Sequence, residues 1–285
     1  MRLRPVDRVI LAYVTIVSVV ALVRLPDIRS SGWVLVSNAL IVLLVVLVNR
    51  SGLGRAGRAL REIYPLIIIV GLYGALDVLS GFGAARTQDA VVQRWEAAIF
   101  GGQVSREWWR QFPSTFWSTV LHGAYFSYYL VVPAGPLWFL ATGKTRELRR
   151  TMLVIVSVFV ACYLVFLFFP VAGPYYEFPR PTGPFVDNPA ARLVYRLLAR
   201  GSAYGAAFPS SHVAATVAAT VTVAATAPRL GILLAVPTVL LTVGVVYCQM
   251  HYAVDAVAGV VVAGLALAGA LLLERGTPLP STGRP

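Results

Sequence analysis

The sequence predicts an all-α integral membrane protein, a polytopic helical bundle with about eight transmembrane helices. Of its 285 residues, 58% are hydrophobic and only 13% are charged, and the mean hydropathy is +0.75. Apolar runs of about 16 to 27 residues recur along the chain, each long enough to cross or nearly cross a bilayer. The two cysteines lie in separate runs. These observations exclude a soluble enzyme, a disordered chain and a disulfide-stapled secreted domain.

The apolar runs divide the chain into eight expected spans and three regions. In chain order, the spans are 9–24, 33–48, 63–82, 114–140, 152–172, 209–227, 230–248 and 251–273. The first run ends without a small-residue cleavage site, so we expect a span there and not a cleaved signal peptide. The three regions are an N-terminal two-helix membrane segment (1–62), the main membrane domain (63–273) and a disordered tail (274–285).

Basic residues predict the orientation of the chain. The net charge is +12. Eight crossings place both termini on one side, together with the loops 49–62 and 141–151, where Arg and Lys are concentrated. The positive-inside rule makes that side cytoplasmic, and basic residues beside spans favour membrane orientation over nucleic-acid binding. Arginine outnumbers lysine 23 to 1, which indicates a bacterium of high GC content and hence a bacterial plasma membrane.

Two longer segments, 83–113 and 173–208, are expected on the opposite side. Within the first, residues 88–100 have the apolar spacing of a short amphipathic helix, with Trp95 suited to the interface, and we expect this helix to lie flat on the bilayer. The second segment begins rich in Pro and Gly, becomes helix-like over 189–199 and leads directly into the next span. A loop of this length is usually functional.

Two of the three histidines are expected to meet at one membrane face. His212 starts the span 209–227, and His251 starts the last span. The 39 positions between them fit two helices of about 18 residues, which cross the roughly 30 Å hydrocarbon core and return. Both histidines therefore lie on the face that receives 173–208, opposite the basic loops. Three separate segments can build one pocket there.

His251 and Asp255 have the spacing of a nucleophile and its orienting group. Four positions apart on a helix, they share a face, so the carboxylate can accept a hydrogen bond from one imidazole nitrogen. The other nitrogen is then free as a nucleophile, as in catalytic triads. The alternative is an interfacial pair that holds two helices together. Ionisable residues at membrane depth favour a functional role.

The residues before His212 predict an anion site. Ser210 and Ser211 open a helix after a run of small residues, so free backbone N–H groups and the positive end of the helix dipole point outward. Serine near the cap and Pro209 in the first turn are also ordinary helix-start signals. The paired histidines favour the anion site.

These motifs resemble a known family. The stretches Phe208-Pro209-Ser210-Ser211-His212 and His251-Tyr252-Ala253-Val254-Asp255 are similar to the second and third signature motifs of the type 2 phosphatidic acid phosphatase superfamily. With LHGAYFSYY at 121–129 and FPVAGP at 169–174, they resemble the branch that contains fungal inositol phosphorylceramide synthase. The resemblance runs through residues 86 to 265. It implies a phosphatidic-acid-phosphatase-like catalytic core within 63–273.

The resemblance implies phosphoryl chemistry that needs no metal and no cofactor. His251 would attack phosphorus to form a phosphohistidine, Asp255 would orient His251, and His212 would protonate the departing alkoxide before a second acceptor takes the group. Such chemistry depends on positioning and charge stabilisation, and histidine can serve in both roles near neutral pH. A metal site built from these three residues is an alternative, as is a non-catalytic transporter or scaffold of the same fold.

The chain departs from the family pattern at two phosphate-binding positions. Val245 stands where the phosphatases have an arginine, and alignment on Arg180 puts Gly173 where they have a lysine. We expect Arg180 to replace these cations, because a guanidinium can bind phosphate oxygens bidentately. Arg86 and Arg200 are further phosphate-binding candidates. For each arginine the alternative is a solvated loop position.

Further polar and aromatic residues could contact the substrate. The candidates are Tyr175, Tyr176, Asp77 and His122. For the last two, hydrogen bonding between helices is the favoured interpretation, since charge at membrane depth needs a partner. A second aromatic group favours packing within a span over a lipid slot; its members are Tyr125, Phe126, Tyr128 and Tyr129.

Together these features predict a membrane lipid phosphotransferase. It would move a phosphoryl head group, such as phosphoinositol, from a phospholipid donor to a lipid hydroxyl at the extracytoplasmic face. Loss of the two family cations and the resemblance to the synthase branch favour transfer over hydrolysis. The alternative is a phosphatase that cleaves phosphatidic acid or a polyprenyl phosphate. The expected partners are lipids of the bilayer.

Overall fold

The computed structural model describes residues 3–50, 54–81, 86–201 and 203–275. These residues form thirteen α-helices and one short 3-10 helix, η1 (Gly183–Phe185). The α-helices are α1 (Pro5–Arg24), α2 (Ser31–Val48), α3 (Arg55–Leu79), α4 (Asp89–Phe100), α5 (Val104–Gln111), α6 (Thr115–Phe126), α7 (Tyr128–Ala141), α8 (Thr145–Phe168), α9 (Pro174–Glu177), α10 (Pro189–Gly201), α11 (Ser211–Ala224), α12 (Pro228–Tyr247) and α13 (Ala253–Arg275).

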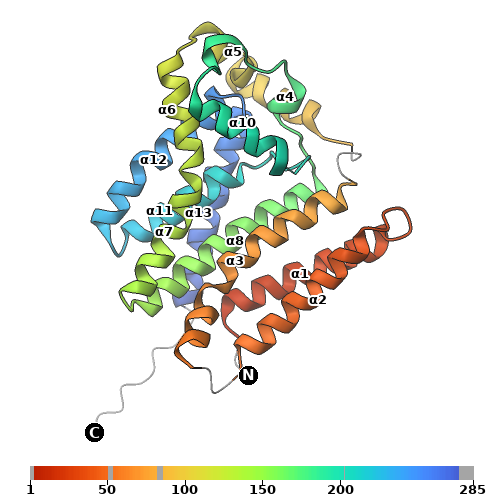
Figure 1. The fold of residues 1–285 in the computed structure, drawn as a ribbon, viewed down its shortest axis with the longest axis vertical. Helices are drawn as coiled ribbons and strands as arrows, with labels where there is room; N and C mark the ends of the chain where they lie inside the picture. The colour runs from red at the N-terminus through yellow and green to blue at the C-terminus, as the bar shows by residue number, and fades with distance from the viewer. Residues whose placement is uncertain (1–2, 51–53, 82–85, 202, 276–285) are drawn as a thin grey trace.

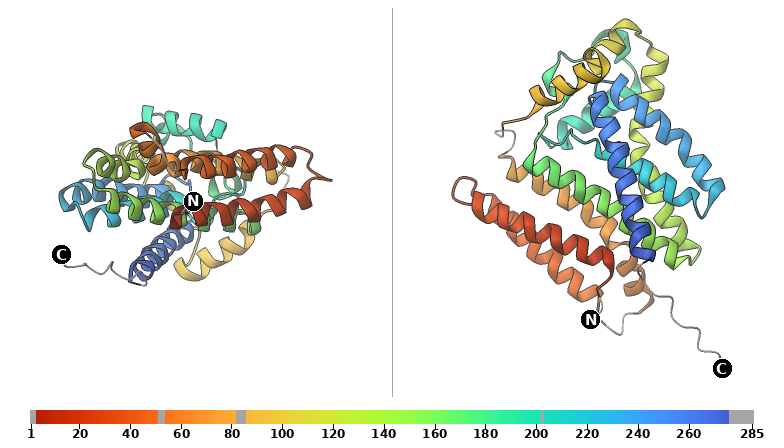
Figure 2. Two further views of the ribbon diagram at one scale, coloured as in Figure 1. Left: turned by 90° about the horizontal axis from the view of Figure 1, so that it is seen from below. Right: turned by 180° about the vertical axis from the view of Figure 1, so that it is seen from behind.

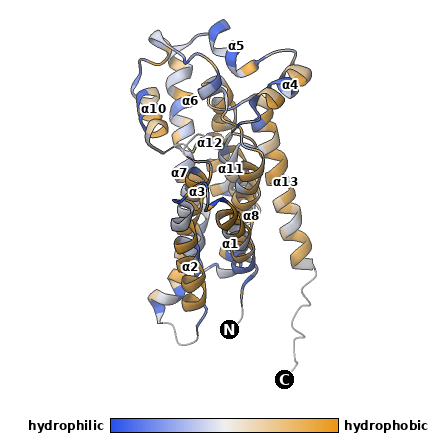
Figure 3. Ribbon diagram, turned by 90° about the vertical axis from the view of Figure 1, so that its right-hand side faces the viewer, coloured by the Kyte–Doolittle hydropathy of each residue, from blue (hydrophilic) through white to orange (hydrophobic). Residues whose placement is uncertain are grey.

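The prediction of an all-α membrane bundle is confirmed. Seven helices of the described residues are long and apolar enough to span a bilayer, with α6 and α7 counted together as one helix, Thr115–Ala141. Hydrophobic residues dominate the long helices, whereas hydrophilic residues gather at α5 and at the ends of the bundle (Figure 3).

The sixth of the eight expected spans, 209–227, is shorter than predicted. Helix α11 has 14 residues and a length of about 21 Å, less than the hydrocarbon core. It lies in the centre of the bundle and packs against α7, α8, α12 and α13 (Figure 1). Because these helices surround it, the backbone groups at its ends can be satisfied by protein and need not reach the bilayer surface.

Several helices begin earlier than their apolar runs. Helices α1, α3 and α8 start at Pro5, Arg55 and Thr145, before the expected starts at 9, 63 and 152. Hydropathy marks only the part of a helix that lies in hydrocarbon, while the backbone hydrogen bonds continue into polar flanks. The division expected after residue 62 consequently falls inside α3. At the other end α13 continues to Arg275, and tail residues 276–285 lie outside the described residues.

A buried ion-pair network joins three helices at one end of the bundle. Glu62 of α3 pairs with Arg4, just before α1, at 3.2 Å and with Arg149 of α8 at 2.6 Å. Asp7 accepts hydrogen bonds from Arg4 and from the Tyr64 hydroxyl, both on its Oδ1. The start of α1, α3 near Glu62 and the start of α8 therefore lie at one end of the bundle, and the assignment of this end to the cytoplasmic side stays a prediction.

The other end carries the helices of the two long connecting segments. Helices α4, α5 and α10 gather there, away from the start of α1 and the end of α13 (Figures 1 and 2). Helix α10 confirms the helix expected over 189–199, and α4 confirms the one expected over 88–100.

The structure shows which face of α4 contacts the protein, and the expectation that α4 lies flat on the bilayer stays a prediction. Its buried residues are Asp89, Val92 and Glu96, so two acidic side chains face the protein, where backbone N–H groups of other segments bind them. Trp95 is 40% exposed and stacks on Phe169, with 5.8 Å between ring centroids. Helix α4 is therefore docked on the bundle by a polar face, which a hydropathy pattern assigns to water.

Glu62→Gln should destabilise the fold. The substitution leaves Arg149 without its carboxylate partner and Arg4 with Asp7 alone. Breaking a buried pair costs about 3–5 kcal/mol, and since Arg149 is half exposed we expect about 2–3 kcal/mol. A loss of about 5–10 °C in Tm follows for a chain of this size, measurable by thermal unfolding in detergent.

The matched control is Asp187→Asn. Its carboxylate also pairs with an arginine, Arg192, but is 75% exposed, so its loss should leave Tm unchanged. Equal Tm values for wild type and Glu62→Gln would contradict a stabilising role for the network.

Candidate active site

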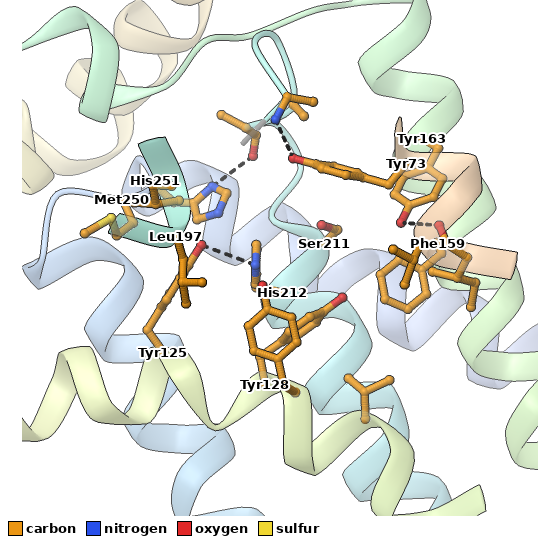
Figure 4. A pocket seen from close by; sticks show the side chains of 18 of the residues that line it. Tyr73, Tyr125, Tyr128, Phe159, Tyr163, Leu197, Ser211, His212, Met250 and His251 are labelled. Atoms are coloured by element: carbon orange, nitrogen blue, oxygen red, sulfur yellow. Dashed lines mark hydrogen bonds between the residues drawn. The ribbon is translucent and has the colours of Figure 1, made fainter. Parts of the chain in front are cut away.

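A cavity of about 470 Å³ lies between α3, α7, α8, α10 and the start of α11. His212, His251 and Ser211 line it, and Figure 4 shows both imidazoles at its wall. Aromatic side chains supply most of the remaining lining. Among the described lining residues the tyrosines are Tyr73, Tyr125, Tyr128, Tyr129, Tyr163, Tyr175 and Tyr176.

His251 is held in one tautomer by a backbone carbonyl. It lies in the turn between α12 and α13, and its Nδ1 is 3.0 Å from the carbonyl oxygen of Ala207. Because a carbonyl oxygen can only accept, Nδ1 must carry the proton, which leaves the lone pair of Nε2 free. The His251 side chain is buried, and it lines the cavity. The ring is therefore held in one orientation with Nε2 free.

The expected contact between His251 and Asp255 is present but longer. Asp255 Oδ2 lies 3.4 Å from His251 Nδ1 and accepts a 2.9 Å hydrogen bond from the Tyr252 backbone N–H. Asp255 is fully buried, and its backbone carbonyl accepts from the Ser210 N–H at 3.0 Å. The carboxylate therefore fixes the turn that carries His251, while the shorter bond to the ring comes from Ala207.

His212 faces the same cavity from α11. Its Nε2 lies 3.2 Å from the Tyr125 hydroxyl, and its ring packs against Tyr128, with 4.6 Å between ring centroids. The His212 and His251 ring centroids are 5.8 Å apart. The structure thus brings together the two histidines that the helix arithmetic places on one face, and a phosphoryl-sized group at the cavity wall could contact both rings.

A short backbone frame presents the Ala207 carbonyl to His251. Val171 pairs with the 205–207 strand-like stretch: its N–H donates to Gly205 O at 3.0 Å, and its carbonyl accepts from Ala207 N at 2.9 Å. Gly173 has φ +91°, and a Cβ there would lie 2.8 Å from the Ala207 Cβ. The close approach requires glycine. A lysine, which the resemblance would place at this position, does not fit here.

Only one of the two serines expected to bind an anion faces the cavity. Ser211 lines the cavity, whereas Ser210 does not. The Ser210 hydroxyl is turned back to accept from the Val213 N–H, so it serves as the N-cap of α11.

Two of the expected phosphate-binding arginines, Arg180 and Arg86, do not line the cavity. Arg180 is exposed and lies over the outer face of Tyr175, 4.3 Å from the ring centroid. Burial raises the pKa of the Tyr175 hydroxyl and Arg180 opposes that shift, so the tyrosine is a neutral donor. Arg86 is exposed as well, and the Arg200 side chain lies outside the described residues. Among the described lining residues there is no arginine and no lysine.

Two other candidates are also placed elsewhere. Asp77 is half-buried in α3 and does not line the cavity. His122 is fully buried in α6, with Nδ1 2.8 Å from the Ser118 carbonyl and 3.4 Å from Cys248 Sγ. The contact with Cys248 agrees with the interhelical interpretation for His122, while for Asp77 that interpretation stays a prediction.

The aromatic residues of 125–129 line the cavity, although the sequence favours packing within a span for them. They were expected to pack within a span, yet Tyr125, Phe126, Tyr128 and Tyr129 all line the cavity. The chain breaks at Ser127, between α6 and α7, so that residues which a continuous helix would spread around its axis can face one space. Tyr175 and Tyr176 line the cavity as expected.

A comparison with protein-family models matches residues 92–269 to the PAP2 superfamily. Comparisons with curated proteins and with solved structures gave no match. In the described residues no group of three or more His, Cys, Asp or Glu side chains is arranged to hold a metal ion. The family match covers more than half of the chain and includes both histidines and Asp255. The protein, an integral membrane bundle, therefore belongs to the PAP2 superfamily, whose members are generally phosphatases and phosphotransferases.

Proposed function

We propose that this protein transfers a phosphoryl head group, such as phosphoinositol, from a phospholipid donor to a lipid hydroxyl at the extracytoplasmic face. One observation carries the proposal. Two histidines lie 5.8 Å apart at the wall of a cavity whose described lining is aromatic and apolar and holds neither arginine nor lysine. Such a cavity favours a hydroxyl of a lipid over water as the acceptor, because closing a site to water prevents hydrolysis of a reactive intermediate.

The first half of the reaction forms a phosphohistidine. The Nε2 lone pair of His251 attacks phosphorus, and the P–O bond to the diacylglycerol part of the donor breaks. His212, as its imidazolium, gives its proton to the departing alkoxide. The positive charge that develops on the His251 ring is stabilised by the Ala207 carbonyl and the Asp255 carboxylate, both within reach of Nδ1–H.

The second half regenerates the enzyme. His212, now neutral, takes the proton of the acceptor hydroxyl as its oxygen attacks phosphorus. The P–N bond breaks, and the electron pair returns to Nε2 of His251. Negative charge on the transferring group would be stabilised by the positive end of α11, where Ser211 and His212 lie, and by tyrosine hydroxyls at the wall.

Exposed residues at the cavity support a lipid substrate. Val70 of α3 is 74% exposed and Tyr129 of α7 is 55% exposed, yet both line the cavity. The cavity therefore reaches the apolar outer surface between these helices, where hydrocarbon chains of the bilayer can lie against Val70 while the head group reaches the histidines.

His251→Ala should abolish transfer. Purified protein incubated with phosphatidylinositol and a ceramide or diacylglycerol acceptor should form a new phosphodiester lipid, visible by mass spectrometry. The variant should form it at least about 10³-fold more slowly, because the nucleophile is lost. A donor labelled with ³²P in its phosphate should also leave an acid-labile phosphoenzyme on the wild type alone.

His122→Asn is the matched histidine control, since His122 lies outside the cavity, and it should retain turnover wherever it folds. Release of free phosphate from phosphatidic acid without a phosphodiester product would identify a phosphatase and overturn transfer. Unchanged lipid turnover in His251→Ala would overturn the phosphohistidine.

Val70→Trp should impair lipid access. A larger side chain at the cavity mouth should raise KM for a long-chain donor about 5-fold or more, while a short-chain, water-soluble donor is turned over as before. Ile67→Trp is the control on the same helix, because Ile67 is 59% exposed but does not line the cavity. Equal effects of the two substitutions on KM would argue against an opening at this position.

A further inference from the structure

Helix α4 begins with Asp89, a buried carboxylate that accepts hydrogen bonds from three uncharged groups. Asp89 is 3% exposed. Its Oδ2 accepts from the Ala172 N–H at 2.8 Å, and its Oδ1 accepts from the Gly173 N–H at 2.8 Å and from the Tyr252 hydroxyl at 3.0 Å. Burying a carboxylate is costly unless it is fully hydrogen-bonded, so this residue must bring these donors together to be tolerated.

One arm of Asp89 reaches the frame that holds the Ala207 carbonyl. The two N–H donors belong to residues 172 and 173, which directly follow Val171 in the chain. Val171 in turn accepts a hydrogen bond from Ala207 N at 2.9 Å. A second hydrogen bond joins the start of α4 to the same stretch, because Gln88 N donates to Pro170 O at 2.7 Å. A shift of this stretch would therefore move the carbonyl that accepts from His251.

The other arm reaches the turn that carries His251 itself. Tyr252 is the next residue in the chain and is fully buried. Its hydroxyl donates to Asp89 and receives a 2.9 Å hydrogen bond from Gln93 Nε2, one turn further along α4. Its backbone N–H donates to Asp255 Oδ2 at 2.9 Å. Tyr252 thus connects Asp89 to the turn that carries His251.

We infer that Asp89 is a positioning residue for His251. One carboxylate holds both partners of the bond that orients the ring: the turn that carries the imidazole and the backbone frame that carries its acceptor. The inference rests on the proposed role of His251 as nucleophile. Asp89 lies three residues before the segment 92–269 that matches the family model, whereas His251 and Tyr252 lie within that segment.

A second carboxylate on the same face of α4 offers a matched comparison. Glu96 is fully buried, and its Oε2 accepts from the Val254 N–H at 2.9 Å, while Oε1 has no hydrogen-bond partner. Glutamine at 96 can keep this one bond through its carbonyl oxygen. Asparagine at 89 has one acceptor oxygen for donors on two sides, so it must lose at least one bond. The two substitutions remove the same charge and differ in the bonds lost.

Asp89→Asn should lower kcat about 10- to 100-fold with KM within about 3-fold, because a displacement of reacting groups by a fraction of an ångström to one ångström costs this much. In single turnover, labelling of the enzyme by ³²P donor should slow by the same factor. Tyr252→Phe removes the hydrogen bond between Tyr252 and Asp89 but leaves the two backbone bonds of Asp89, so it should reduce kcat by a smaller factor. The double variant should reduce kcat by less than the product of the two single-variant factors, because both substitutions disturb the hydrogen bonds of the same carboxylate. Glu96→Gln should keep kcat within about 3-fold.

Three results would overturn the inference. They are unchanged labelling in both Asp89→Asn and Tyr252→Phe, an equal loss of kcat in Glu96→Gln, and a rise in KM that accounts for the whole effect. If Asp89→Asn does not fold, Tyr252→Phe carries the test alone, with unchanged labelling against it. A wild type that forms no phosphoenzyme would instead overturn the proposed function, so the two failures are distinguishable.

Discussion

The hydrogen bond from His251 Nδ1 to the Ala207 carbonyl is the interaction on which the rest of the site depends. It selects the tautomer that leaves Nε2 free, and it aims the ring at the cavity shared with His212. The carbonyl is in place because residues 205–207 pair with Val171 and because Gly173 allows the two stretches to approach. Long helices alone do not supply this geometry. The connecting segments, packed at one end of the bundle, supply it.

Burial of polar groups explains how these segments are held. A chain surrounded by hydrocarbon must satisfy its polar groups internally, and this protein does so with carboxylates that accept from backbone N–H groups. Asp89, Glu96 and Asp255 each bind the backbone of residues that precede or begin a helix at the site. The opposite end uses a different solution, in which Glu62 pairs with Arg4 and Arg149. One end is thus fixed by ion pairs and the other by buried carboxylates, of which Asp89 and Asp255 bind the segments that carry His251 and its acceptor.

The composition of the cavity wall sets the chemistry that the site can perform. Val245 is buried in the core and Gly173 packs against Ala207, so neither position offers a cation to the cavity. Arg180 lies on the far side of Tyr175 and does not line the cavity. Charge on a transferring group must then be stabilised by hydroxyls, by the helix α11 dipole and by the two imidazoles. A wall of tyrosines also suits a polyol head group, since hydroxyls pair with hydroxyls and ring faces pack on C–H surfaces.

The sequence by itself determined the all-α membrane class, most of the spans, the helices at 88–100 and 189–199, and the meeting of His212 and His251. These features follow from hydropathy and from the rise per residue of a helix, which are local properties. Only the tertiary structure decided that Ala207 orients His251, that Tyr125 contacts His212, that α11 is short, that Arg180 lies outside the cavity, and that α4 turns Asp89 and Glu96 inward. Every residue has a backbone carbonyl, so a sequence does not show which carbonyl will orient a side chain. A carboxylate such as that of Asp89 is predicted to face solvent, because the N–H groups that bind it lie more than 80 positions away in the chain and only the fold brings them close.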